Sequence, residues 1–288
     1  MPSTPGGHRP SPSDLVRGFS LEMTGKDGPA LAEAADTIPP GTHVNVTYLG
    51  NEDLPMRVSA AAAVRACGFD PVPHISARRV LSAGELDGFL QELQAQAGPS
   101  RVFAVGGDPA DPLGPYPDAL SLITSGRLEA HGITQVAFGG YPEGHPEIDD
   151  ATLWKALEDK AAAARDAGLA GSIITQFGFD TAPVLTWLAE LRERGVDLPV
   201  RIGVPGPAGI KRLLAYARRF GVASSAGIAH KYGFSLTNLL GTTGPDRFVT
   251  DLAEALVPEV HGEVGLHLYT FGGLQATARW AVEFGAGS

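Results

Sequence analysis

Short apolar runs alternate along the chain with longer segments in which apolar residues recur at helical spacing. Eight of the short runs predict strands, and most are apolar on both faces, as a parallel sheet covered by helices requires. The predicted strands are residues 18–23, 43–48, 71–76, 102–105, 135–139, 172–177, 200–204 and 264–270. The predicted helices between them are residues 29–36, 55–67, 83–97, 117–125, 150–167, 182–194 and 208–220.

Several of these helices follow residues that favour a helix N-terminus, namely Ser82, the pair Asp149-Asp150, and Asp180. Eight alternating strand and helix units predict an α/β fold, a (β/α)8 TIM barrel, with a doubly wound open sheet as the alternative. We expect a single catalytic domain over residues 15–288. The proline-rich and glycine-rich residues 1–14 predict a disordered N-terminal tail.

The connection before the last strand is longer than the others, because residues 221–262 follow the helix. It contains two helical patterns, residues 236–240 and 246–256. We interpret it as an elaborated barrel connection, and the sequence does not decide whether it closes over a substrate as a lid. Glycines follow several strands, as in Gly106-Gly107 and Gly272-Gly273, where they let backbone approach a ligand closely.

Composition narrows the classes of function. A chain of 288 residues with 43% hydrophobic and 19% charged residues is typical of a globular protein. The net charge of −10 argues against a nucleic-acid or membrane surface as partner. The single cysteine, Cys67, excludes an internal disulfide and a multi-thiolate metal site. Without a long apolar run or a signal-peptide pattern, we expect a cytoplasmic protein.

Polar residues at the strand ends should converge on one face of a barrel. Glu22 lies within a strand between Leu21 and Met23, where a carboxylate is costly unless it is paired, hydrogen-bonded or protonated. This makes Glu22 the candidate general acid, and a structural carboxylate is the alternative. Gln176 ends the sixth strand and offers both a donor and an acceptor, unless neighbouring backbone satisfies it. Asp108 follows two glycines, and its alternative is an ordinary turn or helix-capping role.

Other chemistries find weaker support. His74, His145 and His267 could form a metal site with Glu143 or Asp108, but HxH and HExxH spacings are missing, so we expect no metal. A serine hydrolase would need a GxSxG motif, which is absent. A Schiff-base aldolase would need a lysine on a predicted strand, and none lies there.

Seven motifs, read in chain order, resemble those of the methylenetetrahydrofolate reductase family. They are Glu22, Val46-Thr47-Tyr48, Pro73-His74, Gly107-Asp108, Tyr141-Pro142-Glu143-Gly144-His145-Pro146-Glu147, Ile174-Thr175-Gln176-Phe177 with Phe179-Asp180, and His267-Leu268-Tyr269-Thr270. The fifth and sixth are specific and the others are individually weak. The resemblance covers nearly the whole chain after about Gly18, and without a long C-terminal extension the chain is similar to the short bacterial catalytic form.

The resemblance implies an oxidoreductase of one-carbon metabolism that reduces 5,10-methylenetetrahydrofolate to 5-methyltetrahydrofolate, a step toward methionine biosynthesis. By position, Glu22 matches the acid that helps to protonate N10 and so opens the imidazolidine ring to a 5-iminium cation. Asp108 matches the carboxylate that binds the pterin and stabilises that cation. Gln176 matches the amide that contacts folate, and Tyr269 is a further expected substrate contact.

The family also implies a redox-cofactor pocket, lined here by Thr47, His74, Tyr141 and His145. Most members hold FAD, but the basic residues expected around it are missing. Gly106 replaces the arginine of an Arg-Gly-Asp turn, Ala164 replaces a basic helix residue, and Gly272-Gly273 replaces an Asn-Arg pair. These departures argue against tight FAD binding.

We therefore expect a flavin-independent member in which NADH or NADPH passes hydride directly to the iminium carbon, which requires only two stacked partners. An FAD-dependent ping-pong enzyme and a barrel that binds folate without reducing it remain alternatives. Arg78 and Arg79 fit a 2′-phosphate site or ordinary surface arginines. The sequence leaves open the choice of nucleotide and whether the chain forms a homo-oligomer.

Overall fold

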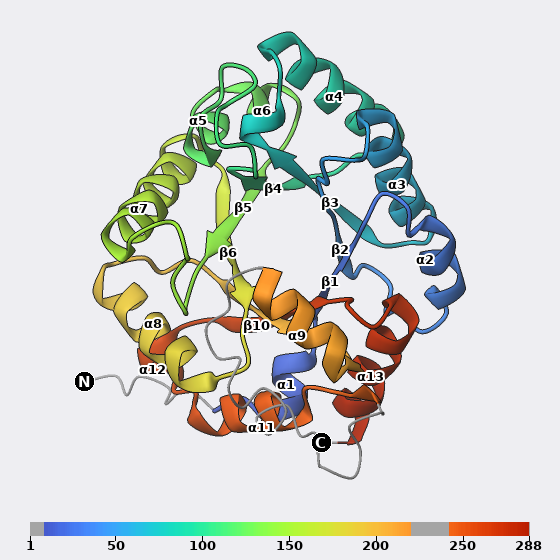
Figure 1. The fold of residues 1–288 in the computed structure, drawn as a ribbon, viewed down its shortest axis with the longest axis vertical. Helices are drawn as coiled ribbons and strands as arrows, with labels where there is room; N and C mark the ends of the chain where they lie inside the picture. The colour runs from blue at the N-terminus through green and yellow to red at the C-terminus, as the bar shows by residue number, and fades with distance from the viewer. Residues whose placement is uncertain (1–8, 220–241, 288) are drawn as a thin grey trace, which may run out of the picture.

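A closed barrel of eight parallel strands forms the centre of the molecule, and helices surround it (Figure 1). The computed structural model describes residues 9–219 and 242–287. Around the barrel the strand order is β1-β10-β7-β6-β5-β4-β3-β2, so the predicted (β/α)8 TIM barrel is confirmed and the open sheet is excluded. The strands are β1 (Ser20–Met23), β2 (His43–Val46), β3 (Asp70–Ser76), β4 (Arg101–Val105), β5 (Gln135–Gly140), β6 (Ala170–Phe177), β7 (Val200–Pro205) and β10 (Val264–Tyr269).

The main outer helices lie close to their predicted positions. They are α2 (Gly28–Ala34), α3 (Leu54–Ala66), α4 (Ala83–Gln96), α5 (Ala119–Ile123), α7 (Asp150–Asp166), α8 (Thr181–Glu193), α9 (Ile210–Arg219) and α11 (Asp246–Ala255). The predicted N-caps are confirmed, because the side chains of Ser82, Asp149 and Asp180 each accept a hydrogen bond from a backbone N–H of the first turn. None of the described helices combines the length and apolar character that crossing a bilayer requires.

Several smaller elements are absent from the sequence prediction. They are α1 (Pro12–Val16), η1 (Ala77–Arg79), α6 (Arg127–Ala130), α12 (Pro258–His261), α13 (Leu274–Gly287) and the antiparallel pair of β8 (Ala208–Gly209) and β9 (Thr242–Thr243). Most are too short for a periodic apolar pattern to reveal them. The helix predicted at residues 236–240 lies outside the described residues.

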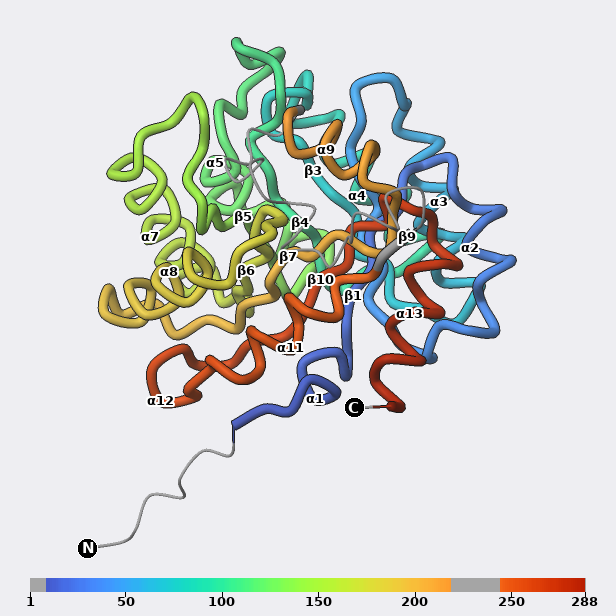
Figure 2. Tube along the Cα trace, turned by 60° about the horizontal axis from the view of Figure 1, so that its bottom comes forward, coloured from blue at the N-terminus to red at the C-terminus, as the bar shows by residue number. Residues whose placement is uncertain are grey.

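The prediction of a disordered tail over residues 1–14 is wrong at its C-terminal end, because residues 12–14 belong to α1. A capping box between Ser11 and Asp14 starts this helix. Leu15 and Val16 are buried, and α1 contacts α13 and α11 (Figure 2). The apolar contacts after the cap, not local propensity, hold the segment in place. Residues 1–8 lie outside the described part of the chain.

The barrel interior has an apolar side and a polar side. Val72, Phe103, Ala137 and Ile174, one each from β3 to β6, form an apolar cluster of their own. The buried polar side chains Ser20, Asn45 and His267 come from β1, β2 and β10. In the barrel register Ser20 is paired with His267, and Glu22 with Asn45. The polar side therefore leads along β1 to Glu22, close to the carboxyl end of the strand.

Candidate active site

Glu22 lies between two histidines at the carboxyl end of the barrel. Its Oε2 atom is 3.9 Å from Nε2 of His74 and 3.6 Å from Nε2 of His267. The Glu22 side chain is 20% exposed, whereas those of His74 and His267 are 8% and 0% exposed. Among the described residues, only these two histidines lie within ion-pair distance of the Glu22 carboxylate. No described arginine forms a salt bridge with Glu22, as would be expected for a structural carboxylate. Glu22 is thus held among imidazoles, with one side open to the mouth.

His74 is a neutral neighbour of this carboxylate. Burial lowers the pKa of His74 to about 4, although Glu22 opposes this shift and His267 adds to it. The Asn45 amide nitrogen donates to Nε2 of His74 over 3.2 Å, so this nitrogen is an acceptor. The contact between His74 and Glu22 is therefore dipolar and not a salt bridge at neutral pH.

His267 presents a buried nitrogen to Glu22. Its Nδ1 lies 2.9 Å from the Ser20 hydroxyl, which fixes the ring. Its Nε2 is buried and has no hydrogen-bond partner within residues 9–219 and 242–287. When Ser20 donates to Nδ1, the proton of the neutral ring lies on Nε2 and faces the carboxylate. A small movement of Glu22 toward the ring would close the 3.6 Å gap to a hydrogen bond.

Residues at the carboxyl end of β10 hold the rim beside Glu22. The Thr270 hydroxyl donates to the backbone carbonyl of Glu22 over 2.7 Å, which fixes the end of β1. The Tyr269 hydroxyl donates to the Thr175 carbonyl over 3.2 Å. Burial raises the pKa of Tyr269 well above its usual range, and Glu22 and Tyr141 add to the shift. Tyr269 therefore stays a neutral phenol at the site.

Gln176 and Tyr269 share a small cavity at the barrel mouth. The cavity has a volume of about 180 Å³, and Tyr141 and Lys160 also line it. The Gln176 Oε1 atom accepts from the backbone N–H of Phe177 over 3.0 Å, so the local satisfaction expected as the alternative is present for the oxygen. The amide nitrogen makes no hydrogen bond to any described residue. Gln176 can thus donate to a ligand in this cavity.

A larger cavity adjoins the small one and extends between α7 and α8. Its volume is about 880 Å³, and it shares Tyr141 and Lys160 with the small cavity. The Tyr141 ring packs edge-on against His145 with centroids 5.5 Å apart, and burial raises the pKa of Tyr141. Of the predicted cofactor-pocket residues, Tyr141 therefore lines both cavities, and His145 packs against it.

Sequence reasoning missed Lys160 as a site residue. Burial lowers its pKa to about 8, and its Nζ atom lies 5.3 Å from the centre of the Phe138 ring. The signal was present in α7, where Lys160 falls between Leu157 and Ala164 on the buried face of the helix. A lysine on that face brings positive charge to the cavity wall.

The other predicted residues are divided between the mouth and the outer rim. The Thr47 hydroxyl is buried and has no hydrogen-bond partner among the described residues, and its role as a cofactor contact remains a prediction. Asp108 follows Gly107, whose φ of +97° favours glycine, and it lines neither of the two cavities. Both Asp108 carboxylate oxygens accept from Arg79, each over 2.6 Å, and the Asp108 side chain is 72% exposed.

This arrangement bears on two expectations. Arg79 pairs with an exposed carboxylate, as ordinary surface arginines do, and a 2′-phosphate site at Arg78 and Arg79 remains a prediction. Asp108 is not grouped with the acid and the amide in this conformation, so its assignment to the pterin remains a prediction. Within residues 9–219 and 242–287, no three His, Cys, Asp or Glu side chains are grouped as metal ligands would be.

Comparisons with known proteins bear on what this mouth binds. The family model for methylenetetrahydrofolate reductase matches residues 23–226. Methylenetetrahydrofolate reductase (NADH) 1 of Arabidopsis thaliana is 26% identical over 208 residues, which cover 65% of this chain and 33% of the plant protein. Methylenetetrahydrofolate reductase 2 of Saccharomyces cerevisiae is 31% identical over 142 residues, which cover 47% of this chain and 22% of the yeast protein. The chain thus matches a third or less of the length of these relatives.

The fold has a counterpart among solved structures. An uncharacterized protein from Clostridium thermocellum, which binds two copies of 5-methyl-5,6,7,8-tetrahydrofolic acid, superposes with a TM-score of 0.59 over 96% of both chains. The two sequences are 10% identical, so the likeness establishes the shared fold alone.

Proposed function

Because the chain belongs to the methylenetetrahydrofolate reductase family, we propose that it reduces 5,10-methylenetetrahydrofolate to 5-methyltetrahydrofolate with NADH or NADPH. The observation that carries the proposal is the position of Glu22. It lies at the barrel mouth between two buried histidines, within the electrostatic reach of Tyr269, which lines the small cavity. A protein of the same fold binds 5-methyl-5,6,7,8-tetrahydrofolic acid, which supports a reduced folate as the ligand.

In the proposed first step Glu22 acts as the general acid. Its proton passes to N10 while the bond between N10 and the methylene carbon breaks, which leaves a 5-iminium cation. Glu22 is suited to this role because Nε2 of His267 lies 3.6 Å away and can hydrogen-bond the carboxylate once the proton has left. His74 stays neutral and adds no positive charge that would repel the cation.

In the second step hydride, with its electron pair, leaves the nicotinamide and bonds to the iminium carbon. The products are 5-methyltetrahydrofolate and the oxidised nucleotide. Gln176 donates to the pterin, and Tyr269 supports the ring as a neutral phenol. The 880 Å³ cavity between α7 and α8 is a suitable place for the nucleotide, with Lys160 as a cationic partner for its phosphates. Asp108 reaches the pterin only if its pair with Arg79 opens.

The residues at the expected flavin positions do not fit FAD well. Ala164, which replaces the basic helix residue of the family, is uncharged and buried, so it cannot bind a pyrophosphate. At Gly272 a Cβ atom would overlap the carbonyl oxygen of Pro207, so the asparagine of the family cannot be accommodated there without a shift. Among the described residues, the cations that line the larger cavity are Lys160 and Arg78, and Arg78 is held by the backbone carbonyls of Pro109 and Pro117. These features support direct hydride transfer without bound flavin.

Two measurements on the purified protein test the proposal. Oxidation of NADH or NADPH should depend on added 5,10-methylenetetrahydrofolate and should yield 5-methyltetrahydrofolate. Folate binding without nucleotide oxidation would replace the reductase with a non-reducing folate-binding barrel. The visible spectrum should show no flavin band after gel filtration. A stoichiometric band that persists would overturn the flavin-free mechanism, and the kinetics would then be ping-pong.

We also propose that residues 15–288 form one catalytic domain. We further propose a cytoplasmic location, which cell fractionation tests, and a homo-oligomer, which light scattering on the purified protein tests.

A further inference from the structure

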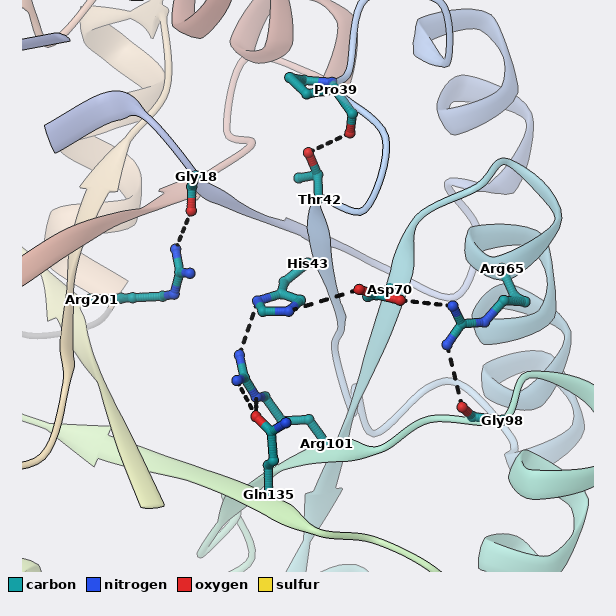
Figure 3. Close-up of polar contacts among 10 residues, drawn as sticks. All are labelled: Gly18, Pro39, Thr42, His43, Arg65, Asp70, Gly98, Arg101, Gln135 and Arg201. Carbon is teal, nitrogen blue, oxygen red and sulfur yellow. Dashed lines mark hydrogen bonds and ion pairs between the residues drawn. The ribbon is translucent and has the colours of Figure 1, made fainter. Parts of the chain in front are cut away.

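A cluster of basic side chains lies at the amino ends of the barrel strands, opposite the candidate active site. Arg101 and His43 are the first residues of β4 and β2, and Arg201 is the second residue of β7. Figure 3 shows Arg101 reaching His43 on one side of this barrel floor, while Arg201 reaches the carbonyl of Gly18 on the other. We call Arg101, Arg201 and His43 the floor cluster.

Neighbouring groups hold the floor cluster in position. The Gln135 Oε1 atom accepts from Nε of Arg101 over 2.9 Å and also from its Nη2. The Nη1 atom of Arg101 donates to Nδ1 of His43 over 2.9 Å. The Nη1 atom of Arg201 donates to the carbonyl of Gly18 over 2.6 Å. These contacts orient the guanidinium groups without neutralising their charge, because every acceptor is a neutral group.

Within the described residues, neither arginine of the floor cluster has a carboxylate within ion-pair distance. Asp70, the acid that acts on Arg101 and His43, is already bound to Arg65 over 2.7 Å and lies 4.0 Å from Nε2 of His43. Glu263, the acid that acts on Arg201, lies beyond ion-pair distance of it. Cations withdrawn from water are normally paired, since their desolvation is costly. The positive charge of the floor cluster is therefore only partly compensated, in a chain whose net charge is −10.

The perturbed acid–base equilibria agree with this geometry. Burial and, to a smaller extent, Arg101 lower the pKa of Arg201 to about 10, against the opposing effect of Glu263. Burial, Arg101 and Arg201 together lower the pKa of His43 to about 4, and Asp70 only partly opposes them. Both shifts have the direction expected where positive charge is confined without a counter-ion.

The floor cluster also offers donors and space. Nη1 of Arg201 is taken by backbone carbonyls, but its Nε and Nη2 atoms make no hydrogen bond to any described residue. These two N–H groups form the edge of a guanidinium that binds an oxyanion through two parallel hydrogen bonds. Gly265 is paired with Arg201 in the strand register, so no side chain fills the adjacent position. The His43 side chain is 28% exposed, which gives solvent ions access.

From this arrangement we infer that the floor of the barrel binds a phosphate oxyanion, with Arg201 as the two-point donor and Arg101 and His43 beside it. The anion supplies the missing counter-charge and joins β2, β4 and β7 at the closed end of the barrel. The site lies at the opposite end of the barrel from Glu22, so it does not depend on the proposed reductase activity.

The test is calorimetric titration of the purified full chain with inorganic phosphate, at constant ionic strength with chloride as the balancing anion. We expect saturable binding of one phosphate per chain and a higher melting temperature with phosphate than with chloride. Arg201→Gln should weaken binding by about tenfold or more, since it removes the charge and the two-point edge. Arg201→Lys keeps the charge and should still weaken binding if the edge is the determinant.

Arg165→Gln is the matched control, because Arg165 lies on α7, its side chain is 77% exposed and its ion-pair partner is Asp166 rather than a member of the floor cluster. It should bind phosphate as the wild type does. If Arg201→Gln does not fold, Arg201→Lys and Arg101→Gln decide the question. A titration in which the heat of phosphate binding does not saturate would indicate general ionic screening and would overturn the proposal. Equal phosphate affinity in the Arg201 variants and the wild type would do the same.

Discussion

Replacing Glu22 by glutamine tests the proposed acid with almost no change in shape. The substitution keeps the side-chain length and removes the transferable proton. Its contacts to His74 and His267, at 3.9 and 3.6 Å, are longer than hydrogen bonds, so little folding energy is lost with the charge. General acid catalysis contributes about 10²-fold to 10⁴-fold, so turnover should fall by at least ~100-fold, or about 3 kcal/mol in the barrier.

The assay is the steady-state oxidation of the reduced nucleotide with saturating 5,10-methylenetetrahydrofolate. The loss should fall on kcat, while KM changes little, because glutamine still occupies the mouth and the proton is needed only as the ring opens. Melting temperature and folate binding should stay near wild type. Glu254→Gln, an exposed change on α11, is the control and should leave kcat unchanged. Turnover of the Glu22 variant close to wild type would refute the assignment.

Three further predictions concern the surroundings of the site. Lys160→Met should raise the KM for the nucleotide by about tenfold, and in the wild type nucleotide affinity should fall as pH rises through about 8, where Lys160 loses its charge; a pH-independent KM would contradict this. Gly272→Ala should destabilise the fold by about 1–3 kcal/mol in urea unfolding through overlap with Pro207, whereas Gly88→Ala, in open space on α4, should not. The pKa of His74, about 4 in the fold against 6.5 ordinarily, means that the unfolded chain binds the proton first on acidification. The free energy of unfolding should therefore fall by up to about 3 kcal/mol between pH ~6.5 and ~4, and His74→Gln should flatten that dependence.

The sequence predicted the barrel well because each barrel strand is a buried apolar run and most of its helices have a cap or a periodic face. It failed for α1, whose order comes from contacts with α13 that lie far away in sequence. For the site, strand-end position was enough to place Glu22 and Gln176 near the mouth. It was not enough for Asp108, because a left-handed glycine after β4 and the guanidinium of Arg79 decide where that side chain lies. Lys160 was missed because its role depends on which face of α7 is buried.

The division of the barrel interior has a practical consequence for engineering. Val72, Phe103, Ala137 and Ile174 share no side-chain hydrogen bonds with Glu22 or its histidines, although Phe103 packs against His74. A combinatorial library for new folate analogues can therefore vary this apolar wall. Ser20, Asn45 and His267 are best left intact. Ser20 and Asn45 hydrogen-bond the two histidines beside the Glu22 carboxylate, and His267 is one of those histidines.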